Sequence, residues 1–277
     1  MKIQILADMH LEFLMNPAVT PPHRAQALLA AIHDTQADVT VFCGDTYTKG
    51  RSCKKARDLI PPERPVILVA GNHEHYGDTY QHSMDRLRKD AAESPGVHFL
   101  ENEAVEIDGV VFLGCTLWSD MRLFQAGADA GLYSFAQTIE ECKQAMNDYR
   151  QIRYLSGAGP YRLLHPNDTL RMHAASTAWL AEQFKRYRNR TMVVVTHHAP
   201  SSRSVHESYR QDILSAAYAS HLDPLVEQSG AALWLHGHNH EVMDYTIAKT
   251  RVVANCYGYE YEVALAKGFR PDWVVEV

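Results

Sequence analysis

Five short stretches of the sequence end an apolar run with side chains that can bind metal ions. The apolar runs cover residues 3–7, 39–43, 66–70, 192–196 and 231–235. The polar residues that follow them are Asp8, His10, Asp45, Asn72, His73, His197, His198, His238 and His240. Carboxylate, amide and imidazole groups offer oxygen and nitrogen ligands, which suit Mn, Fe, Zn or Ni better than a soft metal. These residues are therefore candidates for a metal site.

The spacing of these residues suits a shared site. Asp8 and His10 lie two positions apart, so an extended chain directs both side chains to the same side, and His238 and His240 have the same spacing. The glycine before Asp45 allows the backbone to turn sharply away from its strand, because no Cβ is in the way. Two carboxylates, an amide and at least four imidazoles exceed what one catalytic ion takes from protein. They favour two ions that share a bridging carboxylate.

The elements that must position these residues are strands and helices in alternation. Short runs rich in Val, Ile and Leu are typical of strands covered on both faces, and helical patterns lie between them at residues 25–33, 80–92 and 167–187. The alternation predicts an α/β fold, and strands at both ends of the chain predict a two-sheet α/β/β/α sandwich with helices on the outer faces. Ligands of open α/β sheets bind at the carboxyl ends of the strands, so the five stretches should converge.

The domain organisation follows from where this pattern stops. We expect one domain over residues 1–277, with an inserted helical segment at about 118–168, where the strand pattern is interrupted. The next helix is expected to be capped by Asn167 or Asp168. Asp108-Gly109 predicts a hairpin between two further strands.

Composition and charge exclude several classes of protein. The net charge of −6 disfavours a surface that binds nucleic acid through bulk positive potential. No apolar run approaches the ~20 residues of a membrane helix, and the start of the sequence lacks the pattern of a signal peptide. The five cysteines are scattered without CxxC spacing, which predicts reduced thiols and no thiolate metal site. We therefore expect a cytoplasmic protein that does not bind membranes, and the charge disfavours nucleic acid as its partner.

Taken in order, the motifs Asp-x-His, Gly-Asp, Gly-Asn-His-Glu, His-His and Gly-His-x-His resemble those of the calcineurin-like metallophosphoesterase superfamily, in its bacterial phosphodiesterase-like branch. The resemblance covers residues 8–240. It implies that one divalent ion binds Asp8, His10, Asp45 and His240, and that a second binds Asp45, Asn72, His197 and His238. It also implies that His73 is the catalytic histidine, and that His198 supports the site or contacts substrate.

The activity implied by this resemblance is hydrolysis of a phosphate ester at a dinuclear metal centre. Hydroxide held by the two ions would attack phosphorus in line with the leaving oxygen. The expected substrate is a small or nucleotide-like phosphodiester. The alternatives are a nuclease or phosphomonoesterase of the same superfamily and, from a different class, a non-catalytic metal-binding module. The metal's identity and the oligomeric state stay open.

One part of the sequence departs from the superfamily pattern. In the phosphoprotein phosphatases, Gly-Asp continues with x-x-Asp, and this aspartate orients the catalytic histidine. Here Asp45 is followed by Thr46, Tyr47 and Thr48, so the orienting carboxylate is missing. We expect that another group holds His73 or that its role is diminished.

Two groups of residues are candidates for substrate contact. A helix is expected from Phe135 to about Arg153, and at ~100° per residue Arg150 and Arg153 lie beside its apolar face. The two arginines could clamp a phosphate, or their stems could cover the core while their guanidinium groups reach water, or the helix could end earlier. The alternating tyrosines at 257, 259 and 261 are expected to pack on a sheet, with stacking on substrate as the alternative.

Overall fold

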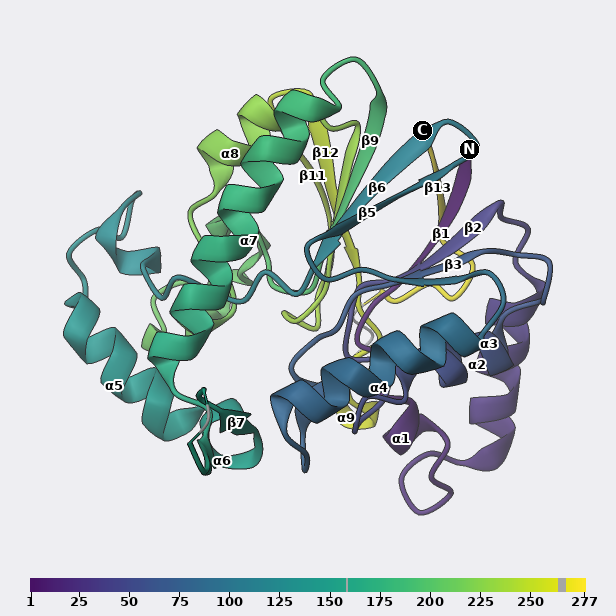
Figure 1. The fold of residues 1–277 in the computed structure, drawn as a ribbon, viewed down its shortest axis with the longest axis horizontal. Helices are drawn as coiled ribbons and strands as arrows, with labels where there is room; N and C mark the ends of the chain where they lie inside the picture. Colours follow the sequence, from purple (N-terminus) through teal and green to yellow (C-terminus); the bar gives the residue numbers. More distant parts are fainter. Residues whose placement is uncertain (158, 264–267) are drawn as a thin grey trace.

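The five apolar runs form strands in the computed structural model, which describes residues 1–157, 159–263 and 268–277. These strands are β1 (Lys2–Leu6), β2 (Val39–Phe42), β3 (Val66–Leu68), β9 (Thr191–Thr196) and β10 (Leu233–His236). The first three lie in one sheet and the last two in a second sheet, and the two sheets lie face to face (Figure 1). Both sheets therefore contribute strand ends to the candidate site.

Parallel pairing aligns the carboxyl ends of these strands. The first sheet has the order β13-β1-β2-β3-β4, in which β1 to β4 run parallel and β13 pairs antiparallel with β1. The second has the order β11-β12-β10-β9-β6-β5, with four parallel central strands and antiparallel edges. The remaining bounds are β4 (Val97–Phe99), β5 (Glu103–Ile107), β6 (Val110–Cys115), β11 (Val242–Ile247), β12 (Thr250–Asn255) and β13 (Val274–Glu276). The predicted hairpin at Asp108-Gly109 is confirmed, since β5 pairs with β6.

Helices cover the outer face of each sheet, which confirms the predicted α/β/β/α arrangement. The five-stranded sheet is covered by α2 (Pro22–Asp34), α3 (Ser52–Leu59) and α4 (Tyr80–Glu93), and the six-stranded sheet by α7 (Pro166–Arg186) and α8 (Asp223–Ser229) (Figure 1). The short helices are α1 (Leu11–Leu14), α9 (Glu260–Val263), η1 (His73–His75), η2 (Leu123–Gln125), η3 (Ser202–Ser204), η4 (Glu207–Tyr209) and η5 (Ile213–Ala217). Within the described ranges, no helix is long and apolar enough to cross a membrane.

Alternation along the strands divides their apolar side chains between two faces. Ile3 and Ile5 of β1 face the second sheet and belong to one core cluster with Phe112 of β6. Leu6 faces the opposite way and packs with Ile32 of α2. The core between the sheets therefore fixes their relative position, and with it the distance between the two sets of strand ends.

The described part of residues 118–168 forms more than one helix, so the prediction of one helix to about Arg153 is wrong. The segment forms α5 (Phe135–Ala145), α6 (Asp148–Gln151), β7 (Arg153–Leu155) and β8 (Tyr161–Leu163). Met146 ends α5 with an extended backbone, at φ −72° and ψ 133°. Met146, Tyr149 and Ile152 still pack in one apolar cluster. The predicted apolar face therefore exists, but its residues come from α5, from α6 and from the position just before β7.

The start of α7 also differs from the prediction by a few residues. His165 is the N-cap residue, and its side chain accepts a hydrogen bond from the Asn167 backbone. Asp168 occupies the third helical position and accepts one from the His165 N–H at 3.0 Å, which completes a capping box. Asp168 therefore takes part in the cap, as predicted, but the N-cap residue is His165.

We predict that Phe112→Ala lowers the free energy of unfolding by about 3–5 kcal/mol, because it opens a cavity in the core between the sheets. Phe112 is fully buried there. The matched control is Leu132→Ala, whose side chain is exposed and should matter by less than about 0.5 kcal/mol. Urea unfolding followed by far-ultraviolet circular dichroism measures both changes. Equal effects of the two substitutions would contradict the assigned core.

Candidate metal centre

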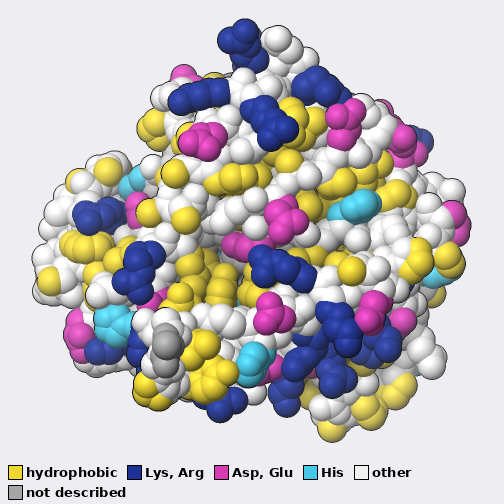
Figure 2. All heavy atoms as spheres, viewed as in Figure 1, with side chains coloured by type: hydrophobic (Ala, Val, Ile, Leu, Met, Phe, Trp, Pro, Cys, Tyr) yellow, Lys and Arg dark blue, Asp and Glu magenta, His cyan; other side chains and the backbone are white. Residues whose placement is uncertain are grey.

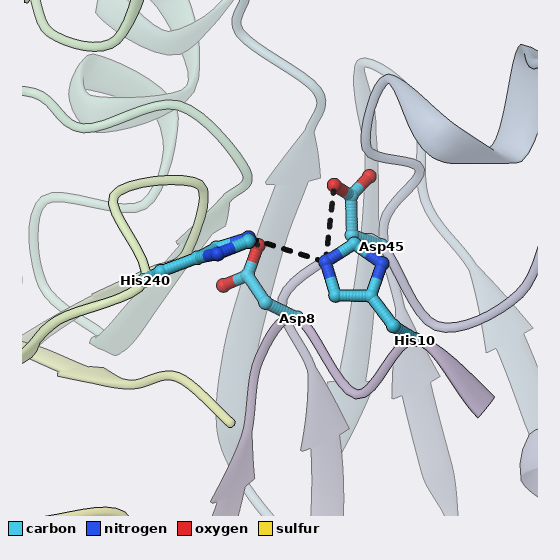
Figure 3. A group of neighbouring side chains, drawn as sticks. All are labelled: Asp8, His10, Asp45 and His240. Carbon is cyan, nitrogen blue, oxygen red and sulfur yellow. Dashed lines mark hydrogen bonds and ion pairs between the residues drawn. The ribbon is translucent and has the colours of Figure 1, made fainter. Parts of the chain in front are cut away.

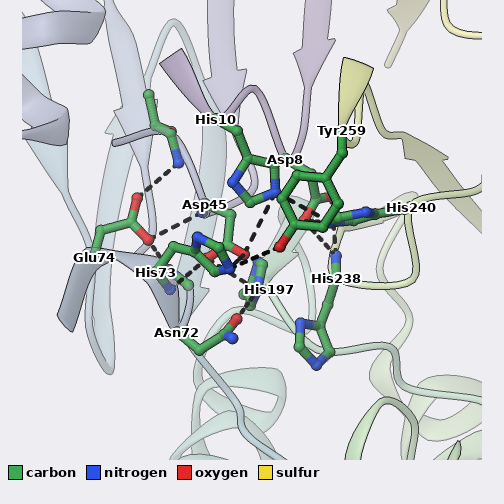
Figure 4. A network of polar contacts seen from close by, with 12 residues as sticks. Asp8, His10, Asp45, Asn72, His73, Glu74, His197, His238, His240 and Tyr259 are labelled. Carbon is green, nitrogen blue, oxygen red and sulfur yellow. Dashed lines mark hydrogen bonds and ion pairs between the residues drawn. The ribbon is translucent and has the colours of Figure 1, made fainter. Parts of the chain in front are cut away.

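The strand ends bring all seven predicted metal ligands into one region (Figure 4). Five of them have left-handed backbone conformations, with φ of 51° for Asp8, 40° for His10, 50° for Asp45, 71° for His238 and 51° for His240. Such conformations cost about 1–3 kcal/mol each for residues other than glycine, and they are typical of functional sites. The surrounding structure must therefore hold these loops in place.

One group of donors consists of Asp8, His10, Asp45 and His240, whose ligand atoms all lie within 4.8 Å of one another (Figure 3). The Nε2 atoms of His10 and His240 are 3.1 Å apart, and the His240 Nε2 lies 3.7 Å from Asp8 Oδ1. His240 Nδ1 is 2.6 Å from Glu262 Oε2, so this nitrogen donates to the carboxylate. Nε2 then presents its lone pair to the group, as a metal ligand does.

The second group consists of Asp45, His197 and His238, and Asn72 adjoins it. His197 Nε2 lies 3.4 Å from Asp45 Oδ1 and 3.0 Å from Asn72 Oδ1. His197 Nδ1 donates to the Cys43 carbonyl at 2.9 Å, which leaves Nε2 free to act as a ligand. The Nε2 atom of His238 is buried without a hydrogen-bond partner among the described residues. Asp45 belongs to both groups, as a bridging carboxylate would.

Burial sets the protonation of these residues in the direction that metal binding requires. Burial lowers the pKa of His10 to about 3 and holds the pKa of His197 and His238 well below the usual value, so these imidazoles are neutral. Burial, with the nearby carboxylates of Glu74 and Asp8, raises the pKa of Asp45 well above its usual value. A divalent cation would counter that rise by favouring the carboxylate form. The donor set thus fits divalent metal ions.

Glu74, the last residue of the Gly-Asn-His-Glu motif, holds the loops of the site together. Its fully buried carboxylate accepts hydrogen bonds from the Gly71 N–H at 2.7 Å and the Thr46 N–H at 2.8 Å. It also accepts from the Asp45 N–H at 3.0 Å and the Ser52 hydroxyl at 2.7 Å. The loops after β2 and β3 are therefore fixed relative to one another (Figure 4).

The inserted segment contributes a residue that sequence analysis missed. Asp148 of α6 is buried, and its Oδ1 accepts from Asn72 Nδ2 at 2.8 Å and from the Tyr76 hydroxyl at 2.6 Å. This contact fixes the Asn72 amide so that its oxygen faces His197. Burial raises the pKa of Asp148, although the two hydrogen bonds partly offset that effect. No pattern in the sequence near Asp148 indicates this role.

His73 lies between two side chains that were not assigned to the site. Its Nδ1 is 3.5 Å from Glu12 Oε1, and its Nε2 is 3.1 Å from the Tyr259 hydroxyl. Burial tends to raise the pKa of Glu12, but the imidazoles of His10 and His73 outweigh it and lower that pKa to about 2. Tyr259 stacks on His10 in a loop after β12, so the prediction that it packs on a sheet is wrong. The side chain of the tyrosine at 261 lies outside the described residues.

A cavity of about 430 Å³ lies beside the two donor groups. Among its lining residues are Asp45, Asn72, His73, His238 and His240. Its walls carry tyrosines and apolar side chains, namely Tyr76, Tyr209, Tyr218, Tyr259, Met146, Val205 and Leu214. Among the residues described, no lysine or arginine lines it. The metal ligands therefore face a small-molecule space with few positive charges of its own.

The structure does not bring Arg150 or Arg153 to this cavity. Arg150 is exposed, and its guanidinium group donates to the Ala145 carbonyl at 2.7 Å and to Asn147 Oδ1 at 3.0 Å. Arg153 begins β7 and is also exposed. The helix that would have placed both beside one apolar stripe ends at Ala145. The structure agrees with the alternative in which their guanidinium groups reach water, and we do not assign them to substrate.

His198 is buried behind His238 and is not among the residues that line the cavity. Its ring centroid lies 4.1 Å from that of His238 and 5.2 Å from that of Trp118. Its backbone N–H donates to the Thr116 carbonyl at 3.2 Å, and burial lowers the pKa of the imidazole to about 3. This position fits support of a ligand rather than contact with substrate.

Comparisons with known proteins show what this chain is similar to. The model of the family described as "Calcineurin-like phosphoesterase" matches residues 1–242. The uncharacterized protein L509 of Acanthamoeba polyphaga mimivirus is 24% identical over 225 residues, which cover 76% of this chain and 75% of L509. The crystal structure of phosphopantetheinyl hydrolase (PptH) from Mycobacterium tuberculosis is similar, with a TM-score of 0.70 and 16% identity, over 100% of this chain and 95% of that one. This second likeness shows a shared fold.

Gly71→Ala should disrupt the donor groups. A Cβ at this position would lie 2.6 Å from the Asp45 backbone nitrogen and 2.7 Å from His197 Cε1, closer than real side chains approach. We expect Mn²⁺ affinity, measured by titration calorimetry of the metal-free protein, to fall by about 10–100-fold or more. Gly159→Ala is the control, since its nearest neighbour would be the Ser156 carbonyl oxygen at 3.4 Å. Unchanged affinity in Gly71→Ala would contradict the site geometry.

Asp148→Ala should weaken the ion next to Asn72, because the Asn72 amide loses the partner that orients its oxygen. Residues that orient ligands typically contribute about 10–100-fold to metal affinity or activity. The same calorimetric titration should show one weakened site and one of nearly normal affinity. Glu141→Ala, an exposed residue of α5 in the same inserted segment, provides the control. Two unchanged sites in Asp148→Ala would show that Asn72 needs no such partner.

Proposed function

Because the chain belongs to the calcineurin-like phosphoesterase family, we propose that it hydrolyses phosphodiesters of small molecules at a dinuclear metal centre. Family membership makes the chain a metal-dependent phosphoesterase. The observation that carries the finer proposal is the position of Asp45, whose carboxylate belongs to both groups of donor atoms. A residue that serves two groups at once is suited to bridge two ions.

We assign one ion to Asp8, His10, Asp45 and His240, and the other to Asp45, Asn72, His197 and His238. When bound, two divalent ions neutralise phosphoryl oxygens and lower the pKa of water from 15.7 to about 7, which supplies a nucleophile at neutral pH. All the donors are oxygen or nitrogen atoms, so Mn, Fe, Zn and Ni are the metals to test.

Two side chains of the protein, His73 and Tyr259, are placed to protonate and contact the leaving group. His73 lines the cavity, and its Nε2 lies 3.1 Å from the Tyr259 hydroxyl and 3.9 Å from Asp45 Oδ2. This nitrogen is therefore at the boundary between the donor groups and the open space, where a leaving oxygen would lie. We assign His73, as an imidazolium that carries a proton on Nε2, as the general acid that protonates this oxygen and is left as the Nδ1-protonated neutral imidazole. The Tyr259 hydroxyl would hold the imidazole or the departing group.

The cavity supports a small substrate with one phosphate. Its volume of about 430 Å³ falls in the range of small-molecule pockets, about 300–1,000 Å³. A phosphodiester carries one negative charge and a monoester up to two, so a site without cationic side chains beyond the metal centre favours the diester. The tyrosines of the wall offer stacking surface and hydroxyl groups for an aromatic or amide-containing leaving group.

The nuclease alternative has less support. The net charge of the chain is −6, and Figure 2 shows apolar, acidic and basic side chains mixed over one face of the molecule. Lys and Arg side chains gather in one area at the lower right of that view, where Figure 1 draws α4, on the outer side of the five-stranded sheet. A nucleic-acid strand requires positive charge that leads into the site.

Asp45→Ala should abolish hydrolysis of bis(p-nitrophenyl) phosphate, because one carboxylate is removed from both donor groups. We expect activity to fall below about one thousandth of wild type, a larger loss than the removal of one hydrogen-bond donor causes. Chelation should inactivate the wild-type protein, and added Mn²⁺ should restore it. Asp58→Ala, on an exposed position of α3, is the control. Full activity of Asp45→Ala would refute the mechanism, and faster turnover of p-nitrophenyl phosphate would favour a phosphomonoesterase.

A further inference from the structure

Glu12 lies beside the Nδ1 atom of the His73 imidazole, whose Nε2 atom lies beside the Tyr259 hydroxyl. It lies in α1, directly after the loop that carries Asp8 and His10, and its side chain is only 12% exposed. Its Oε1 is 3.5 Å from His73 Nδ1 and 3.6 Å from His10 Nδ1. The carboxylate therefore touches the proposed catalytic histidine and one proposed metal ligand at the same time.

The polar atoms of this contact have no other hydrogen-bond partner among the described residues. They are both Glu12 oxygens and the Nδ1 atoms of His10 and His73, and all of them are buried. An unpaired buried polar atom is costly, so the carboxylate and the two imidazoles depend on one another for partners. Glu12 is not among the residues that line the cavity, and both of its oxygens are buried, so its contacts are with the two imidazoles.

We propose that Glu12 is a positioning residue, whose carboxylate holds the His73 imidazole with Nδ1 toward itself and Nε2 toward the leaving group. This inference rests on the proposed function. A histidine with one nitrogen bound to a carboxylate has a fixed tautomer and ring orientation. The Nε2 contact with the Tyr259 hydroxyl at 3.1 Å shows the second nitrogen facing the cavity side. Glu12 thus fills the place of the carboxylate that is missing after Asp45.

The kinetic test compares Glu12→Gln and Glu12→Asp with the wild type, with manganese saturating. Diphenyl phosphate has a poorer leaving group than bis(p-nitrophenyl) phosphate and depends more on a correctly placed acid. Glu12→Gln should lower kcat on diphenyl phosphate by about 10–100-fold, with a clearly smaller loss on the nitrophenyl diester and little change in KM. Glu12→Asp should recover part of the loss. Glu103→Gln, an exposed residue of β5, is the matched control.

A double-mutant cycle separates action through His73 from action through His10. If Glu12 acts through His73, then Glu12→Gln should change kcat by less than about 2-fold in a His73→Gln background. A full, additive loss in that background would overturn the inference. So would a loss of activity that parallels a loss of bound manganese, measured by plasma mass spectrometry, since that pattern assigns Glu12 to His10 alone.

Nuclear magnetic resonance of the metal-free protein gives a readout that needs no activity. The His73 ring nitrogens are assigned from the ¹⁵N signals that disappear in His73→Gln. We expect the Nδ1-protonated tautomer in wild type and a shift toward the other tautomer in Glu12→Gln. Identical His73 signals in both proteins would refute the inference. If wild-type protein with manganese hydrolyses no phosphate ester, the proposed function fails. If wild type and Glu12→Gln hydrolyse both diesters equally, only the role of Glu12 fails.

Discussion

The buried carboxylate of Asp45 is the group on which the rest of the site depends. It lies between two sets of donors, one from each side, and it is 2% exposed. Burial raises its pKa, the carboxylates of Glu74 and Asp8 add to that effect, and the hydrogen bond from the His73 N–H opposes it. An uncompensated buried charge costs several kcal/mol. The fold bears this cost at a position where cations can offset it, so metal binding and folding stability are coupled.

Hydrogen bonds between neighbouring loops stabilise the strained backbone around Asp45. Asp8, His10 and Asp45 each have a left-handed backbone, which a strand end would not adopt on its own. Hydrogen bonds between loops hold them: the Asp8 N–H donates to the Gly44 carbonyl at 3.2 Å and the His10 N–H to the Asp45 carbonyl at 2.9 Å. Across the two sheets, the His238 N–H donates to both Asp8 oxygens at 3.0 Å. Each loop is therefore held in its strained form by a neighbouring loop.

The sequence was sufficient to predict which donor residues lie at the ends of the buried strands. A buried parallel strand has an unmistakable apolar run, and its end has a known place in the sheet, so Asp8, Asp45 and His238 could be brought together without coordinates. Glu12 continues the two-residue spacing from Asp8 and His10, but α1 begins at Leu11, so the extended geometry behind that spacing no longer applies there.

The contacts that Asp148 and Tyr259 make with the site could not be predicted. Asp148 contacts Asn72 across 76 positions of the chain, and Tyr259 contacts His73 across 186. Nothing in the local pattern encodes such distances. The interruption of α5 at Met146 is a further example, because the apolar periodicity continues through it into α6, and no glycine or proline marks the break.

The donor groups and the cavity wall come from different parts of the fold. Strand ends supply the donor groups, and they are rigid because both sheet faces are packed. The cavity wall comes instead from the inserted segment, the loop after β9 and the segment after β12, which contribute Met146, Tyr209 and Tyr259. Such segments can change while the sheets stay the same. The likeness to the mycobacterial hydrolase, at 16% identity, therefore shows a shared fold alone, and a shared fold does not define the chemistry of a site.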